Sequence, residues 1–129
     1  MNKEKAINYW FNMADYDLKT AQVMRDGGRY LYVGFMCHQV IEKALKGLYV
    51  KQHSRIPPYT HNILTLCADL NLVLTEEHQN FFTKLNPLNI EARYPEMKEK
   101  LGKAINKKKA YVLLEKTRSA YKWLKSTKK

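Results

Sequence analysis

The sequence predicts an all-α protein, an antiparallel bundle of four or five helices with up-and-down topology. Apolar residues recur every three or four positions over several long segments, which is the spacing of one helix face. Glycines and prolines interrupt these segments, and no run alternates apolar and polar residues as a strand would. A chain of 129 residues also suits a single domain, which we expect to span residues 1–129.

The stretch over residues 30–52 is the element around which the bundle should be built. Apolar side chains cover more than half of its helical circumference, so we expect neighbours on several sides. One narrow polar strip breaks this pattern, and it consists of Gln39, Glu42, Lys43 and Lys46. The strip has two interpretations. Either it faces solvent, with Glu42 and Lys46 as an ordinary i,i+4 ion pair, or it faces a functional site.

A helix over residues 3–24 comes first and should lie antiparallel to the central helix. Gly27 and Gly28 end it, and the short connection favours packing of the two helices side by side. Asp17 falls within its apolar stripe, where a buried carboxylate needs a partner. That partner is either a structural hydrogen bond or the polar strip of the central helix.

Shorter elements follow the central helix. Pro57 and Pro58 prevent it from continuing, and Thr60 is the expected N-cap of a short helix over residues 61–70. Thr75 should begin a fourth helix, because two glutamates follow it in the first turn.

The last part of the chain has a less regular pattern before it becomes helical again. Residues 87–95 carry two prolines and no clear period, which predicts an ordered loop, and residues 97–105 are weakly helical. Asn106 should cap a final helix over residues 107–125. The basic tail at about residues 126–129 should fray.

Positive charge is concentrated in the C-terminal quarter. The chain has a net charge of +11, and residues 98–129 contribute +10 of it from twelve Lys and Arg against two Glu. Three interpretations remain open: a phosphate-rich ligand such as a nucleotide or nucleic acid, an acidic protein partner, or solubility.

Most catalytic and metal-binding motifs are missing from the sequence. There is no glycine-rich phosphate loop, no nucleophile elbow, and no cysteine or histidine spacing typical of a metal site, so we expect neither metal nor cofactor. Cys37 and Cys67 lie among apolar residues, which indicates buried, reduced thiols and a cytoplasmic protein. No stretch of eighteen apolar residues occurs, and we expect no membrane association.

Arg93 and Tyr94, in the proline-bounded loop, form a second candidate group beside the polar strip. The arginine could bind a phosphate and the tyrosine could stack on a base. In the structural alternative, Tyr94 fills the core and Arg93 pairs with Glu42 or Asp17.

Four segments resemble the HEPN domain family, and they are found in order over nearly the whole chain. The segments are residues 14–18 followed by Ala21, residues 38–46 with the run Gln-x-x-Glu-Lys-Ala-Leu-Lys, residues 58–66 with a Pro-x-Thr-His turn, and residues 92–95 with Arg-Tyr-Pro. Their order and spacing are similar to the small prokaryotic branch, whose members are often encoded beside a minimal nucleotidyltransferase. The resemblance implies a helical bundle, a homodimer, and either RNA cleavage or the binding of nucleotides and partners.

The sequence departs from the ribonucleases of this family at one position. Those members are metal-independent and carry an arginine and a later histidine with four to six residues between them, whereas the corresponding positions after Arg93 hold Lys98, Glu99 and Lys100. Because removal of the 2′-hydroxyl proton needs a group that titrates near neutral pH, we expect that the protein is not an enzyme.

The resulting expectation is a non-catalytic HEPN protein that binds nucleotide or RNA phosphate, a nucleotidyltransferase partner, or both, as one component of a toxin–antitoxin pair. Its expected phosphate-binding residues are Lys43, Lys46, Arg93 and Tyr94, supported by Gln39, Glu42 and Asp17. The alternatives are a ribonuclease with a degenerate active site and a purely structural dimeric module.

Overall fold

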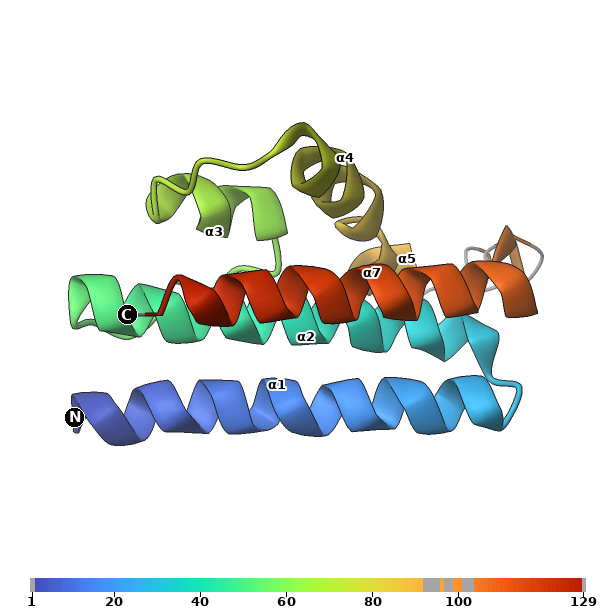
Figure 1. Ribbon diagram of the computed structural model, residues 1–129, viewed down its shortest axis with the longest axis horizontal. Helices are drawn as coiled ribbons and strands as arrows, with labels where there is room; N and C mark the ends of the chain where they lie inside the picture. The colour runs from blue at the N-terminus through green and yellow to red at the C-terminus, as the bar shows by residue number, and fades with distance from the viewer. Residues whose placement is uncertain (1, 92–95, 97–98, 101–103, 129) are drawn as a thin grey trace.

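The computed structural model describes residues 2–91, 96, 99–100 and 104–128, and in these residues the protein is helical, without strands. Figure 1 shows the elements in order. They are α1 (Lys3–Asp26), α2 (Tyr30–His53), α3 (Ile63–Asp69), α4 (Glu76–Leu85), α5 (Leu88–Glu91) and α7 (Lys107–Ser126). The predicted all-α fold is therefore confirmed.

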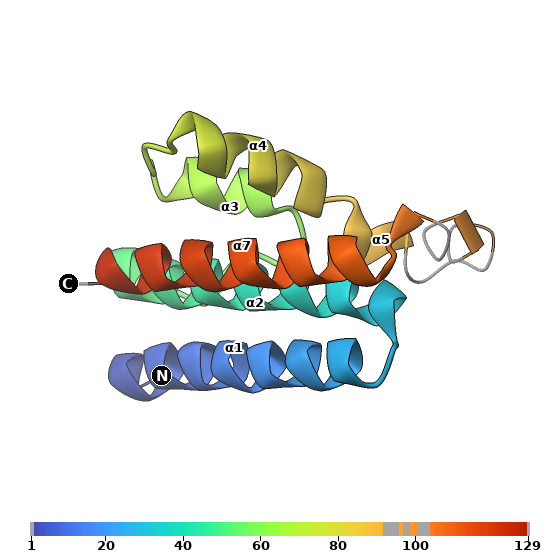
Figure 2. The ribbon, with the colours of Figure 1, turned by 45° about the vertical axis from the view of Figure 1, so that its right-hand side comes forward.

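Three long helices form the body of the molecule. α1 and α2 lie side by side in opposite directions, and α7 packs against α2 (Figures 1 and 2). The shorter α3 and α4 form a layer on the side of α2 and α7 that faces away from α1. This layer returns the chain to the end of the bundle where α2 began, so that α7 runs in the same direction as α2.

The helix ends follow from local sequence. The side chain of Asn106 accepts a hydrogen bond from the amide of Lys109, and that of Thr75 accepts one from His78, as the sequence predicts for N-caps. The predicted cap at Thr60 is wrong, because Asn62 caps α3 instead. The loop predicted over residues 87–95 is also wrong in part. Its residues 88–91 form α5, and residues 92–95 lie outside the described part of the chain.

The core lies around α2, where fourteen of the 24 residues are buried, and this confirms it as the central helix. Gly47 of α2 lets α1 approach closely, since a Cβ there would lie 2.6 Å from the Phe11 ring. Phe11 in turn stacks on Tyr121 of α7, with ring centroids 6.5 Å apart. The phenol of Tyr121 donates to the carbonyl oxygen of Phe11 and contacts Asp15, so three helices meet at this point.

Within the described residues, no helix has the length and apolar character needed to cross a bilayer.

Candidate functional site

Glu42, in the middle of α2, is the centre of a buried polar cluster. Its Oε1 accepts a hydrogen bond from Nδ1 of His61 at 2.9 Å, and its Oε2 accepts one from Nζ of Lys46 at 3.2 Å. Nδ1 of His38 lies 3.7 Å from the same Oε1. His38 and Lys46 stand one helical turn to either side of Glu42, whereas His61 comes from the turn before α3. We name these four residues the Glu42 cluster.

The cluster contradicts the interpretation of Glu42 and Lys46 as a solvent-exposed pair. The pair exists, but both side chains are buried, because the turn before α3 covers Glu42 and the indole of Trp10 lies beside the Lys46 ammonium, 5.6 Å from ring centroid to nitrogen. A carboxylate taken out of water needs several donors, and here Lys46 and His61 supply them.

His38 is the least satisfied member of the Glu42 cluster. Its side chain is fully buried, and neither ring nitrogen has a hydrogen-bond partner among the described residues. The Asn86 side chain and the His61 backbone lie close to the ring without reaching hydrogen-bond geometry. Burial lowers the pKa of His38 to about 4, because desolvation of the imidazolium outweighs the attraction of Glu42. At neutral pH the ring is therefore uncharged.

The other predicted residues of the strip turn to different neighbours. Lys43 forms an ion pair with Asp17 of α1, which confirms that this acid faces inward and finds its partner on the strip. Nε2 of Gln39 donates to the Asn89 side chain in α5 at 3.0 Å. The four strip residues thus reach α1, α5 and the turn before α3, and each lysine has its charge compensated by a carboxylate.

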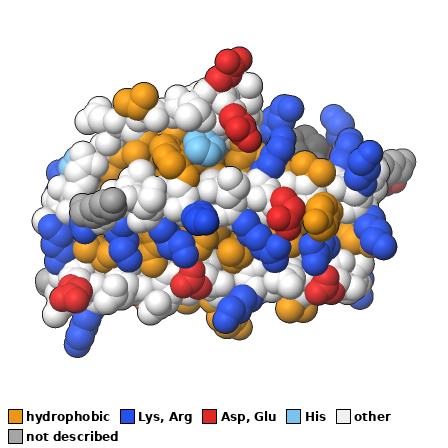
Figure 3. Space-filling model, in the orientation of Figure 1, with side chains coloured by type: hydrophobic (Ala, Val, Ile, Leu, Met, Phe, Trp, Pro, Cys, Tyr) orange, Lys and Arg blue, Asp and Glu red, His pale blue; other side chains and the backbone are white. Residues whose placement is uncertain are grey.

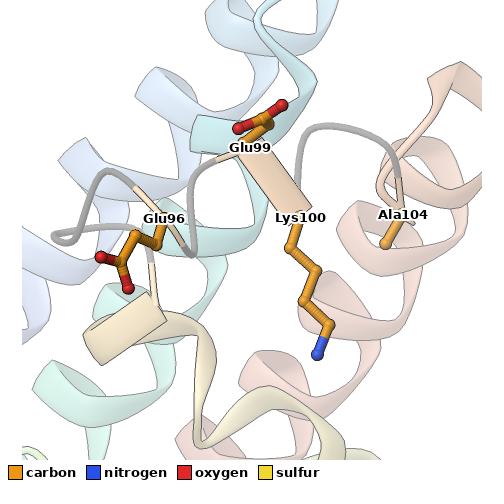
Figure 4. Close-up of a pocket in the computed structure, with 4 residues that line it drawn as sticks. All are labelled: Glu96, Glu99, Lys100 and Ala104. Carbon is orange, nitrogen blue, oxygen red and sulfur yellow. The ribbon is translucent and has the colours of Figure 1, made fainter.

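The predicted convergence of this strip with Arg93 and Tyr94 concerns residues outside the described part of the chain. A pocket of about 470 Å³ is lined by Glu96, Glu99, Lys100 and Ala104, which Figure 4 labels. The side chains of Glu99 and Lys100 point in opposite directions there.

His61 is a residue to which the sequence assigned no role. Its imidazole is half-exposed at a pocket of about 640 Å³ between the turn before α3 and the end of α4, while its Nδ1 is held by buried Glu42. Since a carboxylate only accepts, Nδ1 carries the proton, and in the neutral ring the outer Nε2 is left as the base. The signal in the sequence was the Pro-x-Thr-His turn, but nothing in it showed that Glu42, nineteen positions earlier, is the partner.

A second site lies where α7 begins, and we name it the α7 pocket. It measures about 740 Å³ and is lined by Arg25, Asp26, Tyr30, Lys107, Lys108 and Tyr111. The Arg25 guanidinium lies over the Tyr111 ring, 5.4 Å from its centroid, and also pairs with Asp26 at 3.2 Å. The pocket therefore combines cationic groups with two aromatic rings, drawn from both ends of the α1–α2 turn and from α7.

The first turn of α7 holds three lysines and no acid. This arrangement opposes the helix dipole, which favours anions at an N-terminus by about 0.3–1 kcal/mol per charge. Along the rest of α7 the exposed lysines continue, and Figure 3 shows Lys and Arg side chains in a band across the face where α7 runs. Positive charge is therefore concentrated at a helix end where it lowers the stability of the helix.

Comparison with known proteins identifies the family. The model of the HEPN domain matches residues 7–127, so the chain belongs to the HEPN domain family. Its fold is similar to the crystal structure of TT1696 from Thermus thermophilus, with 24% identity, 98% of both chains covered and a TM-score of 0.81. It is also similar to ST0689, an archaeal HEPN homologue, with 22% identity, 95% of this chain and 98% of that one covered, and a TM-score of 0.68. At this identity the two structures show the fold alone. A search of curated proteins found no match.

Proposed function

We propose that this HEPN-family protein binds a phosphate-bearing ligand, a nucleotide or single-stranded RNA, at the α7 pocket. The observation that carries the proposal is the first turn of α7, where three lysines oppose the helix dipole and two of them, Lys107 and Lys108, line the α7 pocket together with Arg25. A phosphate placed there would meet both the lysines and the positive end of the helix. The unfavourable placement of the lysines in the free protein becomes favourable in the complex.

The aromatic lining suits the rest of such a ligand. Tyr30 and Tyr111 offer ring faces on which a base could stack, and Tyr111 is exposed. The volume of about 740 Å³ is within the usual range of small-molecule sites, roughly 300–1,000 Å³. By contrast, Lys43 and Lys46 are compensated by Asp17 and Glu42, so they offer less positive potential to an added phosphate.

Titration calorimetry with ATP and with a short single-stranded RNA, each at two salt concentrations, tests this proposal. We expect binding that weakens as salt rises, because cations bound to the RNA phosphates are released. The double variant Lys107→Ala/Lys108→Ala should lose roughly tenfold or more in affinity. The matched control is Lys3→Ala/Lys5→Ala, which removes the same charge from exposed positions on α1. An equal loss in both variants, or no binding by the wild type, would contradict the α7 pocket.

The proposals for a protein partner and a cellular compartment rest on the resemblance to the HEPN family, and not on the geometry of the structure. We propose that the protein pairs with a minimal nucleotidyltransferase as one component of a toxin–antitoxin system, and that it acts in the cytoplasm. The free cysteines Cys37 and Cys67 are consistent with a reducing compartment. Co-expression with a nucleotidyltransferase encoded next to it, followed by affinity purification, tests the pairing.

A second candidate function is RNA cleavage, and the His61–Glu42 pair favours it. The sequence lacks the expected histidine after Arg93, but the structure provides a half-exposed imidazole positioned by a buried carboxylate. In this reaction Nε2 of His61 takes the 2′-hydroxyl proton while the 2′-oxygen bonds to phosphorus and the bond to the 5′-oxygen breaks. The imidazolium then returns the proton to the 5′-oxygen, which leaves a 2′,3′-cyclic phosphate and a 5′-hydroxyl.

Incubation with end-labelled RNA in the presence of a chelator distinguishes cleavage from binding alone. We expect His61→Ala to abolish cleavage and Glu42→Gln to reduce it, whereas His53→Ala, at a histidine bound to the Asp69 carbonyl, should have no effect. Intact RNA after incubation with the wild type, or cleavage that survives in His61→Ala, rules this candidate out.

A further inference from the structure

One wall of the α7 pocket carries an acid whose position opposes a helix dipole. Asp26 is the last residue of α1, and it lines the pocket together with Lys107 and Lys108 from the first turn of α7. A carboxylate at a helix C-terminus meets the negative end of the dipole, so it destabilises α1 just as the lysines destabilise α7. Figure 1 shows the end of α1 and the start of α7 at the same end of the bundle. Charges of opposite sign, each unfavourable for its own helix, therefore line one pocket.

The surroundings of Asp26 leave one of its oxygens available as an acceptor. The guanidinium of Arg25 donates from both Nε and Nη2, at 3.2 Å, and both bonds go to Oδ1. Among the described residues Oδ2 has no hydrogen-bond partner, and the side chain is 61% exposed. Arg25 itself lies over the ring of Tyr111. The ion pair therefore holds the carboxylate near the aromatic part of the pocket.

A phosphate alone does not explain an acid at this position. A carboxylate repels a phosphate, so Asp26 weakens phosphate binding unless another part of the ligand contacts it favourably. That part must donate hydrogen bonds, because an ionised carboxylate can only accept them. The two walls of the pocket thus suit a ligand with an anionic group at one end and N–H groups at the other.

Among the nucleobases, guanine matches the acidic wall best. Its Watson–Crick edge carries two neighbouring donors, N1–H and the N2 amine, which can bind one carboxylate together. Adenine and cytosine place an accepting ring nitrogen beside their amine, and uracil places its N–H between two carbonyl oxygens, so each of them turns a lone pair toward the acid. The rings of Tyr30 and Tyr111 line the same pocket and offer faces on which a base can stack.

We propose that Asp26 binds the Watson–Crick edge of guanine in the α7 pocket and makes the site selective for guanine nucleotides. The inference rests on the proposed function, because Lys107 and Lys108 must hold the phosphates at the other wall. A site that hydrogen-bonds a group of its ligand rejects analogues that lack this group. At a carboxylate this exposed, we expect a preference of about tenfold for GTP over ATP.

Titration calorimetry with GTP, ATP and inosine triphosphate, which lacks the N2 amine, tests the selectivity. The wild type should bind GTP about tenfold more tightly than ATP, and inosine triphosphate with intermediate affinity. A carboxylate that bound the ribose hydroxyls would give equal affinities for GTP and ATP. That result overturns the inference and leaves the proposed phosphate site standing. If none of the three binds, the proposed function fails and the inference fails with it.

The variant Asp26→Asn assigns the selectivity to this side chain. Since an amide donates as well as accepts, the variant should lose the preference for GTP over ATP and should favour xanthosine triphosphate, which has a carbonyl oxygen in place of the N2 amine. Loss of a negative charge raises the affinity for every triphosphate, so the ratio of two affinities is the measurement. The matched control Asp69→Asn removes an exposed acid from the last position of α3 and should keep the wild-type ratio. A wild-type ratio in Asp26→Asn overturns the inference.

Discussion

The uncharged His38 ring makes the stability of the fold sensitive to mild acid. Burial lowers its pKa to about 4 in the folded protein, from about 6.5 in the unfolded chain, and the groups that face it are Glu42 and His61. Above pH 6.5 neither state binds a proton at this site, so it has no effect. As the pH falls from 6.5 to 4, the unfolded chain takes up the proton first, and the free energy of unfolding should decrease by about 3 kcal/mol.

Urea denaturation followed by circular dichroism across this pH range measures the loss. His38→Gln removes the titrating group and should flatten the curve between pH 6.5 and 4, although the variant is less stable at neutral pH. His53→Gln is the control, because His53 is partly exposed and lies outside the Glu42 cluster. A wild-type stability that stays constant down to pH 4 would mean that the ring is protonated or solvated in the fold.

Single residues could be predicted where helical spacing was enough to place them. The apolar stripe of α1 predicted that Asp17 faces inward, and spacing predicted the Glu42–Lys46 pair. Spacing within one helix did not show what covers that pair, because this depends on the return of the chain at His61. The role of His61 thus required the tertiary structure.

At the scale of the helices, the close contact between α1 and α2 depends on Gly47, because glycine has no side chain to keep the two helices apart. A Cβ there would lie 2.6 Å from Cε2 of Phe11 and 3.2 Å from Cβ of Trp10. Phe11 is held against Tyr121 and cannot easily withdraw. Alanine favours a helix by about 1 kcal/mol over glycine, but overpacking costs about 1–3 kcal/mol. We therefore expect Gly47→Ala to lower the free energy of unfolding by up to about 2 kcal/mol.

Chemical denaturation at neutral pH measures this change, with Gly34→Ala as the matched control. A Cβ at Gly34 would meet methyl tips alone, those of Leu88 and Ile105 at 3.0 and 3.1 Å and that of Leu113 at 3.9 Å, and these can move. Its loss should be smaller than that of Gly47→Ala. If Gly47→Ala proves more stable than the wild type, the two helices are not in close contact at this point.

The helices themselves were largely predictable because their signals are local. Apolar periodicity located α1, α2 and α7, and the caps at Thr75 and Asn106 fixed two starts within a residue. The prediction failed where two neighbouring residues can both cap, as with Thr60 and Asn62, since their side chains offer similar acceptors. It also failed at α5, whose single turn is too short to show a period.

At the scale of the whole molecule, charge could be predicted but its geometry could not. The sequence showed that the last quarter is basic, and the structure adds that the lysines of α7 begin beside Arg25, contributed by the end of α1. This proximity depends on the direction of α7, which the layer of α3 and α4 determines. The course of such connections cannot be read from the spacing of apolar residues, so the sequence did not predict the α7 pocket.

The contact of Tyr121 with Phe11 and Asp15 joins segments more than one hundred residues apart. A ribosome makes α1 and α2 early, but the phenol that completes their packing emerges only after α7 has been translated. Until then the parts of α2 and α1 that α7 covers in the complete fold stay open to solvent. A chain whose synthesis stops before Tyr121 should therefore leave apolar side chains of α2 uncovered, and we expect proteases to cleave it faster than the full-length chain.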